Sequence, residues 1–550
     1  MASSSNPLVD PLPSATTPRR PRPGERPALL LTLTVAVIGL VFTGPFAYVV
    51  VQNFRLGADF SDIFGSSDTW SPLGRSVQLG VAVAASASVI GTTLAWLVAR
   101  SDLPARRLVA VLAPLPLVFP SFVGATALIT GFATGGLLER VVEPVGVDEL
   151  PQLAGFRAAW FVLTLFTYPY VYLPVVARLR RLPASVEESA RLLGRRPLGV
   201  FTSVVLPQAR SAISAGALLV FLYTISDFGA VELLRYDTLT RVIFSNRLAD
   251  RGTAMALSLL LGVLALLVVA IERRMVRHDV PVAASSRPTG LRVPLRRWRW
   301  PAAVGVVGFV GIAIVGPLAS LAHWTIRGMA SSRSRGSLGL DGDGLGSAVT
   351  NTVLVSIVAA IVTVAVVLPI AYATVHYRSR TGAIANTFVV GGFALPGLVT
   401  ALALVFWVLS STAFVRVYQT LPLLVLAYVI HFGAQGTRAS QVAVGGVPRR
   451  LTDAARMLGA GPVRRFLSVD LPIMVPGLLA AAGLVLLSTM KELPATLLLA
   501  PIGFDTLATE IWASMETLSY AQAGLESMVL LGVSAMLTWL LVIRAADRLD

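Results

Sequence analysis

The sequence predicts an all-α integral membrane protein with about 12 transmembrane helices in two parallel six-helix repeats. Of its 550 residues, 55% are hydrophobic and only 13% are charged, which is about half the charged share of ordinary soluble domains. Twelve apolar runs are long enough to cross the hydrocarbon core of a bilayer. One stretch of sequence occurs twice, 265 residues apart, and indicates that the chain is duplicated.

The apolar runs divide evenly between the two halves of the chain. A helix needs about 20 residues to cross the hydrocarbon core, so each run can form one span. In order, the runs cover 28–51, 76–99, 108–134, 158–178, 211–233, 253–271, 300–324, 347–375, 384–412, 417–436, 473–499 and 524–543.

The segments between the runs predict the domain organisation. Residues 1–27 are rich in Ser, Pro and Arg, so we expect a disordered tail. A first unit of six spans follows at 28–272, a basic linker at 273–299 and a second unit of six spans at 300–550. Because six is even, both units have the same orientation and are related by an axis along the membrane normal.

The arginines predict which side of the membrane each loop occupies. They gather after the second run, after the fourth run and in the central linker, which carries eight. The positive-inside rule places these loops and both chain termini in the cytoplasm. The loop 325–346 departs from this rule, because it is expected on the extracytoplasmic side yet contains Arg327, Arg333 and Arg335. We therefore expect a multi-pass membrane protein with both termini in the cytoplasm.

The third and ninth runs are each interrupted by a proline, Pro120 or Pro396. Proline removes a backbone donor and kinks or breaks a membrane helix, which is tolerated where neighbours or a cavity satisfy the freed groups. Two interpretations stay open at this point. Each proline either breaks a helix that lines a translocation pathway or kinks a packed helix.

Charged residues fall within two other runs, at Asp227 in the first half and at Lys491 and Glu492 in the second. Asp227 aligns with Glu492 at the 265-residue offset of the repeat. A charge at bilayer depth costs a few kcal/mol and therefore usually faces a cavity or a partner. We expect these groups to line the translocation pathway or to pair between the halves. The alternative is that both spans end earlier and the charges are interfacial.

The strongest signal lies in the loop after the fourth run of each half. Residues 183–207 and 448–472 are identical at 11 of 25 positions. Each copy begins with helix-forming and small residues and reaches a glycine, Gly194 or Gly459, where a helix can stop with positive φ. Small side chains and a terminal glycine predict an element on which another surface can dock closely.

This pattern resembles the cytoplasmic signature of binding-protein-dependent ABC importer permeases. The signature reads Glu-Ala-Ala, three residues, Gly, nine residues, an apolar residue, one residue and Leu-Pro, and this sequence departs from it at Ser189 and at the shorter carboxylate Asp453. The resemblance implies that each copy is a coupling helix that sits in a cleft of an ATPase subunit. The implied ATPase-coupling residues are Glu188, Ser189, Ala190, Gly194, Leu206 and Pro207 in the first copy, and Asp453, Ala454, Ala455, Gly459, Leu471 and Pro472 in the second.

The resemblance covers nearly the whole chain as two fused permease units. The runs 490–499 and 503–507 are similar to segments of fused permeases that import ferric iron, and thiamine and phosphonate importers are the alternatives. The resemblance implies alternating access, two copies of an ABC ATPase subunit, an extracytoplasmic substrate-binding protein and a location in the plasma membrane of a prokaryote. The partner subunit would bind ATP, so this chain needs no cofactor.

Composition excludes several other classes of function. Lys491 is the single lysine and does not belong to a Gly-Lys-Ser/Thr motif, so the chain is expected to be a transport subunit and not an ATPase. There is no cysteine, and the four histidines lack metal-ligand spacing, so no metal site is expected. The net charge of +16 comes from short arginine-rich loops, which argues against nucleic acid. The alternative from another class is an ion-coupled secondary transporter.

Overall fold

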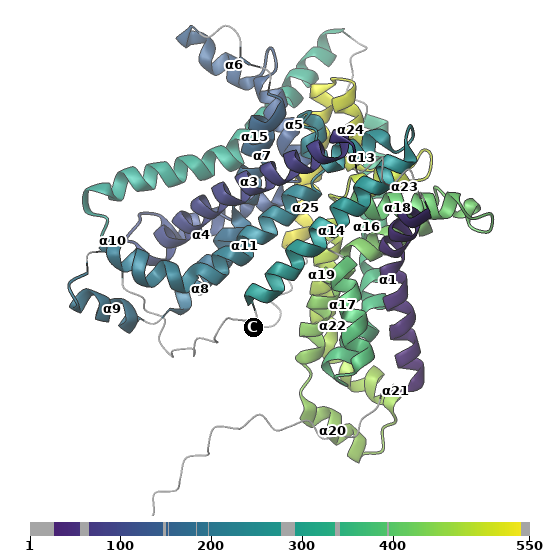
Figure 1. Ribbon diagram of the computed structural model, residues 1–550. Coiled ribbons are helices and arrows are strands. Elements are labelled where there is room, and N and C mark those ends of the chain that lie inside the picture. Colours follow the sequence, from purple (N-terminus) through teal and green to yellow (C-terminus); the bar gives the residue numbers. More distant parts are fainter. Residues whose placement is uncertain are drawn as a thin grey trace, which may run out of the picture.

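The computed structural model describes residues 27–55, 65–146, 150–151, 153–182, 184–195, 197–276, 292–335, 342–392 and 395–540. This part of the chain is helical and contains no β-strand. Figure 1 shows two helical legs that diverge from a common head. The predicted tail and most of the predicted linker lie outside the described residues.

The helices of the first repeat run through α14. Their bounds are α1 (Leu29–Arg55), α3 (Ser67–Arg100), α4 (Arg106–Leu112), α5 (Ser121–Phe132), α6 (Leu137–Val142), α7 (Gly155–Thr167), α8 (Pro169–Arg181), α9 (Ala184–Leu192), α10 (Pro197–Val200), α11 (Leu206–Ser226), α12 (Gly229–Leu233), α13 (Leu239–Asn246) and α14 (Arg251–Val276).

The second repeat follows the same plan. Its helices are α15 (Arg299–Arg335), α16 (Gly342–Val375), α17 (Arg380–Gly392), α18 (Gly397–Leu409), α19 (Leu421–Gly445), α20 (Arg449–Met457), α21 (Pro462–Arg465), α22 (Leu471–Thr489), α23 (Pro494–Leu499), α24 (Leu507–Glu516) and α25 (Tyr520–Thr538).

The helices account for each of the predicted apolar runs. Among the described residues, nine helices are long and apolar enough to span a membrane, or up to eleven if each of two sharply bent helix pairs counts as one span. The 25-residue α19 lies outside that count. It contains His431, Gln435 and Arg438, which lower its hydropathy, and it occupies the place that α7 and α8 hold in the first repeat.

We call the bundle of α3, α7, α8 and α11 the first leg and the bundle of α16, α19 and α22 the second leg. Glycines allow the helices of each leg to pack closely. In the first leg, a Cβ atom on Gly91 of α3 would lie 2.9 Å from the backbone of α8, and one on Gly216 of α11 would lie 2.7 Å from Val171 of the same helix. In the second leg, a Cβ on Gly477 of α22 would lie 2.6 Å from Ala443 of α19. Small residues at such contacts let membrane helices gain van der Waals packing.

The first helix of each repeat packs on the leg of the other repeat. Helix α1 contacts α16, α17 and α18, whereas α15 contacts α4 and α5. Ser320 of α15 donates a hydrogen bond to the carbonyl of Ala127, and Trp324 donates to the carbonyl of Thr130. The two repeats therefore exchange their first helices, and each leg contains a helix from both.

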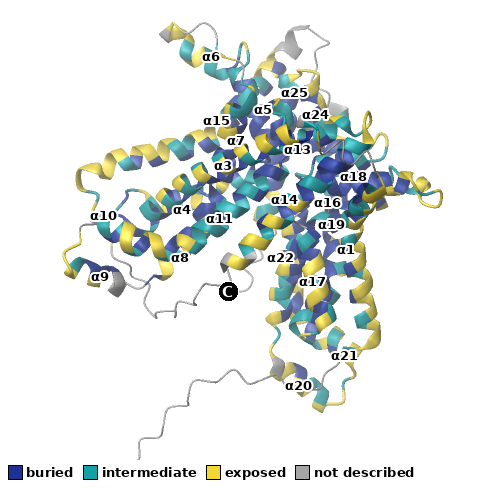
Figure 2. Ribbon diagram, viewed as in Figure 1, coloured by how far each residue is buried: buried dark blue, intermediate teal, exposed yellow. Residues whose placement is uncertain are grey.

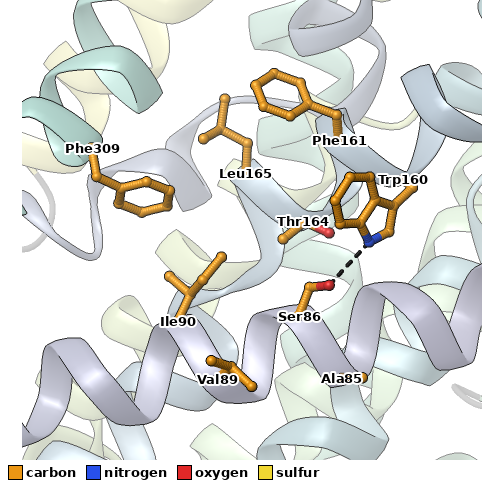
Figure 3. A pocket seen from close by; sticks show the side chains of 9 residues that line it. All are labelled: Ala85, Ser86, Val89, Ile90, Trp160, Phe161, Thr164, Leu165 and Phe309. Atoms are coloured by element: carbon orange, nitrogen blue, oxygen red, sulfur yellow. Dashed lines mark hydrogen bonds between the residues drawn. The ribbon is translucent and has the colours of Figure 1, made fainter.

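Two apolar hollows occupy equivalent places in the two legs. One, of about 480 Å³, lies between α3, α7 and Phe309 of α15, and Trp160 donates there to Ser86 Oγ at 3.0 Å (Figure 3). The other, of about 590 Å³, lies between α16, α19 and α1. Their apolar walls do not suit a charged substrate, and their matching positions reflect the exchange of first helices.

Candidate functional sites: the leg ends and the helix breaks

Helices α9 and α20 lie at the free ends of the two legs (Figure 1) and stop in the same way. Gly194 has φ +79° and Gly459 has φ +78°, a region that favours glycine because it has no Cβ. After each glycine, a backbone N–H bonds five residues back, from Arg195 to Ala190 and from Ala460 to Ala455. These bonds form a Schellman motif, which satisfies the free carbonyls of a helix end. The predicted helix stops are confirmed.

Each of these helices ends in a pair of exposed apolar side chains. Leu192 and Leu193 are 88% and 81% exposed, and Met457 and Leu458 are 89% and 87% exposed. The pairs lie at equivalent positions of the repeat, and Figure 2 shows exposed residues on both α9 and α20. Paired apolar groups exposed beyond the spans are typical of a surface that a partner covers.

The structure separates the predicted coupling residues into two groups. We call α9 and α20 the terminal helices. Six of the predicted residues are exposed on these helices or at their ends, namely Glu188, Ser189, Gly194, Asp453, Ala454 and Gly459. Ala455 is half-buried and Ala190 is buried. Leu206 and Pro207 begin α11, and Leu471 and Pro472 begin α22, in each case after a turn of π-helix. The two Leu-Pro pairs are therefore at the start of a long helix and not on the terminal helix itself.

A buried ion pair attaches α9 to the first leg. The Arg100 guanidinium lies 3.3 Å from a carboxylate oxygen of Glu187, and it donates to the carbonyls of Leu179 and Leu182. Burial raises the pKa of the Glu187 carboxyl, while Arg100 and Arg191 act in the opposite direction. Arg100 is the last residue of α3 and Glu187 is in the first turn of α9, so the pair joins the end of a long helix to α9.

The second leg is held by a different polar cluster. Arg465 Nε lies 3.5 Å from Asp470 Oδ2, and Tyr372 donates to the same oxygen at 2.6 Å. The equivalent positions of the first repeat are occupied by Val200, Val205 and Trp96. The Arg465 cluster joins α21 and the following π-turn to α16, whereas the Arg100 pair joins α9 to α3, a difference that the similarity of the repeated stretch does not predict.

The second candidate site lies where helices break near the head of the molecule. Helices α4 and α5 are bent by 95° and α17 and α18 by 103°. Pro120 and Pro396 precede α5 and α18, and their carbonyls accept the first bonds of these helices, from Gly124 and Thr400. Both prolines therefore mark a true break and not a simple kink. Residues 393–394 of the second break are outside the described part of the chain.

Asp227 lies directly after α11 and two residues before the short helix α12. Its Oδ1 accepts hydrogen bonds from the backbone N–H groups of Ala230 and Val231 at 3.0 and 3.4 Å, which caps α12. The side chain of Ser121, just after Pro120, is close to both Asp227 and Tyr223. The carboxylate is buried in the protein, so it is not at a solvated helix end.

Glu492 has the equivalent place in the second repeat. Its Oε1 accepts from the N–H of Ala495 at 3.2 Å and caps α23, and its Oε2 lies 3.9 Å from His431 Nε2. A Cβ on Gly397, just after Pro396, would lie 2.8 Å from Glu492 Oε1. In both repeats the helix break is therefore adjacent to the carboxylate.

Lys491 reaches between the two repeats. Its Nζ lies 3.4 Å from the carbonyl oxygen of Leu117, which precedes the break at Pro120. Among the described residues, no carboxylate lies within ion-pair distance of Lys491. The nearby ring of Phe228 stacks on Trp512 of the other repeat, with centroids 5.4 Å apart. The structure brings the predicted residues of both repeats to one interface without the ion pair that was considered.

Sequence reasoning missed two further pairs close to the breaks. The rings of Tyr170 and Tyr223 lie 5.7 Å apart, and at the equivalent positions Ser488 donates to Gln435 Oε1 at 2.9 Å. The 265-residue offset could have matched these positions, but their different residue types hid the correspondence. In the described part of the chain, no group of three His, Cys, Asp or Glu residues could hold a metal ion.

These features define a class: a duplicated helical membrane permease with two similar ends and a central interface of broken helices. The chain belongs to the family of binding-protein-dependent transport system inner membrane components, whose sequence model matches residues 87–278 and 365–550. Both matches begin after the exchanged first helices. It is therefore a transport subunit and not an enzyme.

Three relatives span a range of transported substrates. The Fe(3+)-transport system permease protein FbpB 2 of Haemophilus influenzae is 30% identical over 526 residues, which cover 94% of this chain and 98% of the relative. The molybdenum transport system permease protein ModB of Mycobacterium tuberculosis is 35% identical over 35% of this chain and 76% of its own. The putative 2-aminoethylphosphonate transport system permease protein PhnU of Salmonella typhimurium is 26% identical over 43% of this chain and 87% of its own.

Proposed function

We propose that this permease imports ferric iron delivered by an extracytoplasmic binding protein and is driven by a separate ATPase. The observation that carries the ATP-driven part is the pair of exposed, similarly capped helix ends on the two legs. The near full-length similarity to a ferric permease supports the choice of substrate.

The leg ends would bind two copies of an ABC ATPase subunit, one at α9 and one at α20, on the cytoplasmic side. Leu192 and Leu193 would fill an apolar cleft on one copy, and Met457 and Leu458 on the other. The buried contact of Glu187 with Arg100 supports this proposal for the first leg, because it would transmit movement of α9 to α3.

The helix breaks would line the translocation pathway. The charged side chains there are Asp227, Glu492 and Lys491, so two carboxylates accompany one ammonium group. This balance favours a cation over an oxyanion, and carboxylate oxygens are the ligands that hard cations prefer. Iron would pass as the transported substrate, without a permanent site in the permease. The lysine contact with Leu117 would hold the pathway closed between transport cycles.

The alternative substrates are thiamine and a phosphonate. Because the chain is also similar to molybdenum and 2-aminoethylphosphonate permeases, an oxyanion substrate must be tested as well. Each of these similarities covers less than half of the chain. An oxyanion would need a surplus of positive charge along the pathway, which Lys491 alone does not supply.

The substrate is tested in proteoliposomes that contain the permease, its ATPase and its extracytoplasmic binding protein. We expect ATP-dependent uptake of radioactive iron that unlabelled ferric citrate abolishes and that molybdate, a phosphonate or thiamine leaves unchanged. Glu492→Gln should reduce uptake at least tenfold while the complex still assembles. Uptake of an oxyanion or thiamine instead of iron would contradict the substrate, and uptake without ATP would indicate an ion-coupled transporter.

The docking surface is tested separately by replacing one apolar residue at each leg end. Leu193→Ser and Leu458→Ser together should weaken ATPase binding about tenfold or more, because interface anchors each contribute about 1–2 kcal/mol. Both side chains are exposed, so the thermal stability of the isolated permease should not change. Val442→Ser is the control, since Val442 is also highly exposed, at 77%, but lies on α19. Unchanged ATPase binding in the double variant would contradict the proposed docking.

A further inference from the structure

A short basic segment is fixed to the end of the first leg. We call residues 292–299, with Arg106 and Arg107 of α4, the basic strap. The N–H of Val293 donates to the carbonyl of Arg100, and the N–H of Leu295 donates to Asp102 Oδ1, both at 2.8 Å. The backbone of the strap is therefore held by the last residue of α3, Arg100, which also anchors α9, and by Asp102 just after this helix.

The strap concentrates positive charge and indole rings on an exposed surface. Trp298 and Trp300 are 62% and 69% exposed, and Figure 2 shows the first turns of α15 largely uncovered. The one acidic residue in 100–107 and 292–300 is Asp102, whose Oδ1 accepts the bond from Leu295. The strap contains six arginines. Arg106 is partly exposed, and the other five are exposed, namely Arg107, Arg292, Arg296, Arg297 and Arg299.

The position of the strap sets what it can contact. It leads directly into the candidate span Arg296–Ala330. The next surface along α4 and α15 is apolar, with Leu108, Val111 and Val304 exposed. Guanidinium groups bind phosphate in a bidentate manner, and tryptophan side chains favour the depth of lipid headgroups. A ligand with an anionic head and apolar tails would match both parts of this surface.

We propose that the basic strap is a binding site for anionic phospholipid headgroups, with the acyl chains lying along Leu108, Val111 and Val304. Charge complementarity carries the choice of ligand, because clusters of four to eight basic residues next to a membrane helix attract acidic lipids. The adjoining apolar surface favours a lipid over nucleic acid or free phosphate. The site does not depend on which substrate the permease transports.

The test measures which lipids the full-length protein retains. The purified protein is exchanged into mixed micelles with equal amounts of phosphatidylglycerol and phosphatidylcholine of the same acyl chains, and bound lipid is counted by native mass spectrometry. We expect a preference for phosphatidylglycerol. In the variant R107Q/R296Q/R297Q this preference should fall about fivefold per arginine at low salt, equivalent to about 1 kcal/mol for each basic group near an anionic surface.

Two further variants separate the strap from net charge and from misfolding. The control R140Q/R157Q/R416Q removes the same charge from exposed arginines outside the strap and should keep the preference. The variant R107K/R296K/R297K retains the charge and should keep most of it. An unchanged preference in the glutamine variant, or an equal loss in the control, would overturn the proposal. Displacement by inorganic phosphate beyond that caused by chloride of equal ionic strength would also overturn it, in favour of a soluble phosphate ligand.

Discussion

Arg100 and Glu187 lie far apart in the sequence, and each has an ordinary local explanation. Arg100 follows an apolar run, as positive-inside arginines do, and Glu187 lies in the first turn of a helix, where a carboxylate is favoured. Neither explanation predicts that the two meet in a buried pair. Such pairs depend on how α3 and α9 are placed in space, which the local sequence does not contain.

The anchoring role of this pair can be tested by breaking it from either side. Arg100→Ala leaves the buried Glu187 carboxylate unpaired and should cost about 3–5 kcal/mol in the docking of α9. Glu187→Gln should cost less, because the pKa of this carboxyl is already raised by burial, so a neutral group is better tolerated there. Hydrogen exchange of α9 in the two variants measures the difference.

The raised pKa of Glu187 also gives the direction of a pH effect. A carboxyl whose pKa is higher in the folded than in the unfolded protein makes the fold less stable as pH rises between the two values. In Arg100→Ala, lowering the pH from 7.5 to about 5 should therefore restore part of the protection of α9. Lower protection of α9 at the acidic pH would contradict this assignment. The Glu187→Gln variant lacks the carboxyl, so the protection of its α9 should not increase when the pH is lowered.

At the scale of single elements, the terminal helices were predictable because their signals are local. Gly194 and Gly459 are glycines at the end of a helix-forming segment, and both take the expected positive φ. A distortion of the helix at Pro120 and at Pro396 was also predictable, since a proline in an apolar run has a direct backbone consequence. The sequence left open only whether each proline kinks or breaks its helix.

Replacement of the terminal glycine tests how the helix end supports docking. Gly459→Val would force a β-branched residue into left-handed backbone, which costs about 1–2 kcal/mol, and would displace Leu458. We expect ATP hydrolysis without matching transport in the assembled complex. Gly461→Ala is the control, because Gly461 has ordinary φ and open space around it. Normal transport by the Gly459 variant would show that this helix end has no role in coupling.

At the scale of the whole molecule, the sequence predicted the order of the apolar helices but not which helices pack together. Lipid tails are as apolar as the helix surfaces, so hydrophobicity does not specify which helices pack together. The apolar faces of α1 and α15 carry no mark of the leg on which they lie. Their exchange between the repeats therefore became visible only in three dimensions.

The exchange predicts reciprocal effects of two core substitutions. Phe42 belongs to the first repeat but packs on Gly433 of α19, and Phe309 belongs to the second but lies 5.3 Å from Tyr168, between ring centroids. Phe42→Ala should increase hydrogen exchange in α17 and α19 of the second leg, and Phe309→Ala in α7 and α8 of the first. Effects confined to each residue's own repeat would contradict the exchange.

The most direct test of the account is the distance between the two leg ends during the ATP cycle. The chain has no cysteine, so spin labels can be placed at Arg195 and Ala460 alone, the equivalent residues that follow the terminal glycines. Their separation is measured by pulsed electron paramagnetic resonance in the complex with the ATPase, with and without a non-hydrolysable ATP analogue. The account predicts a shorter distance with the analogue, because closure of the ATPase pair would draw α9 and α20 together. An unchanged distance in an assembled, transport-competent complex would contradict it.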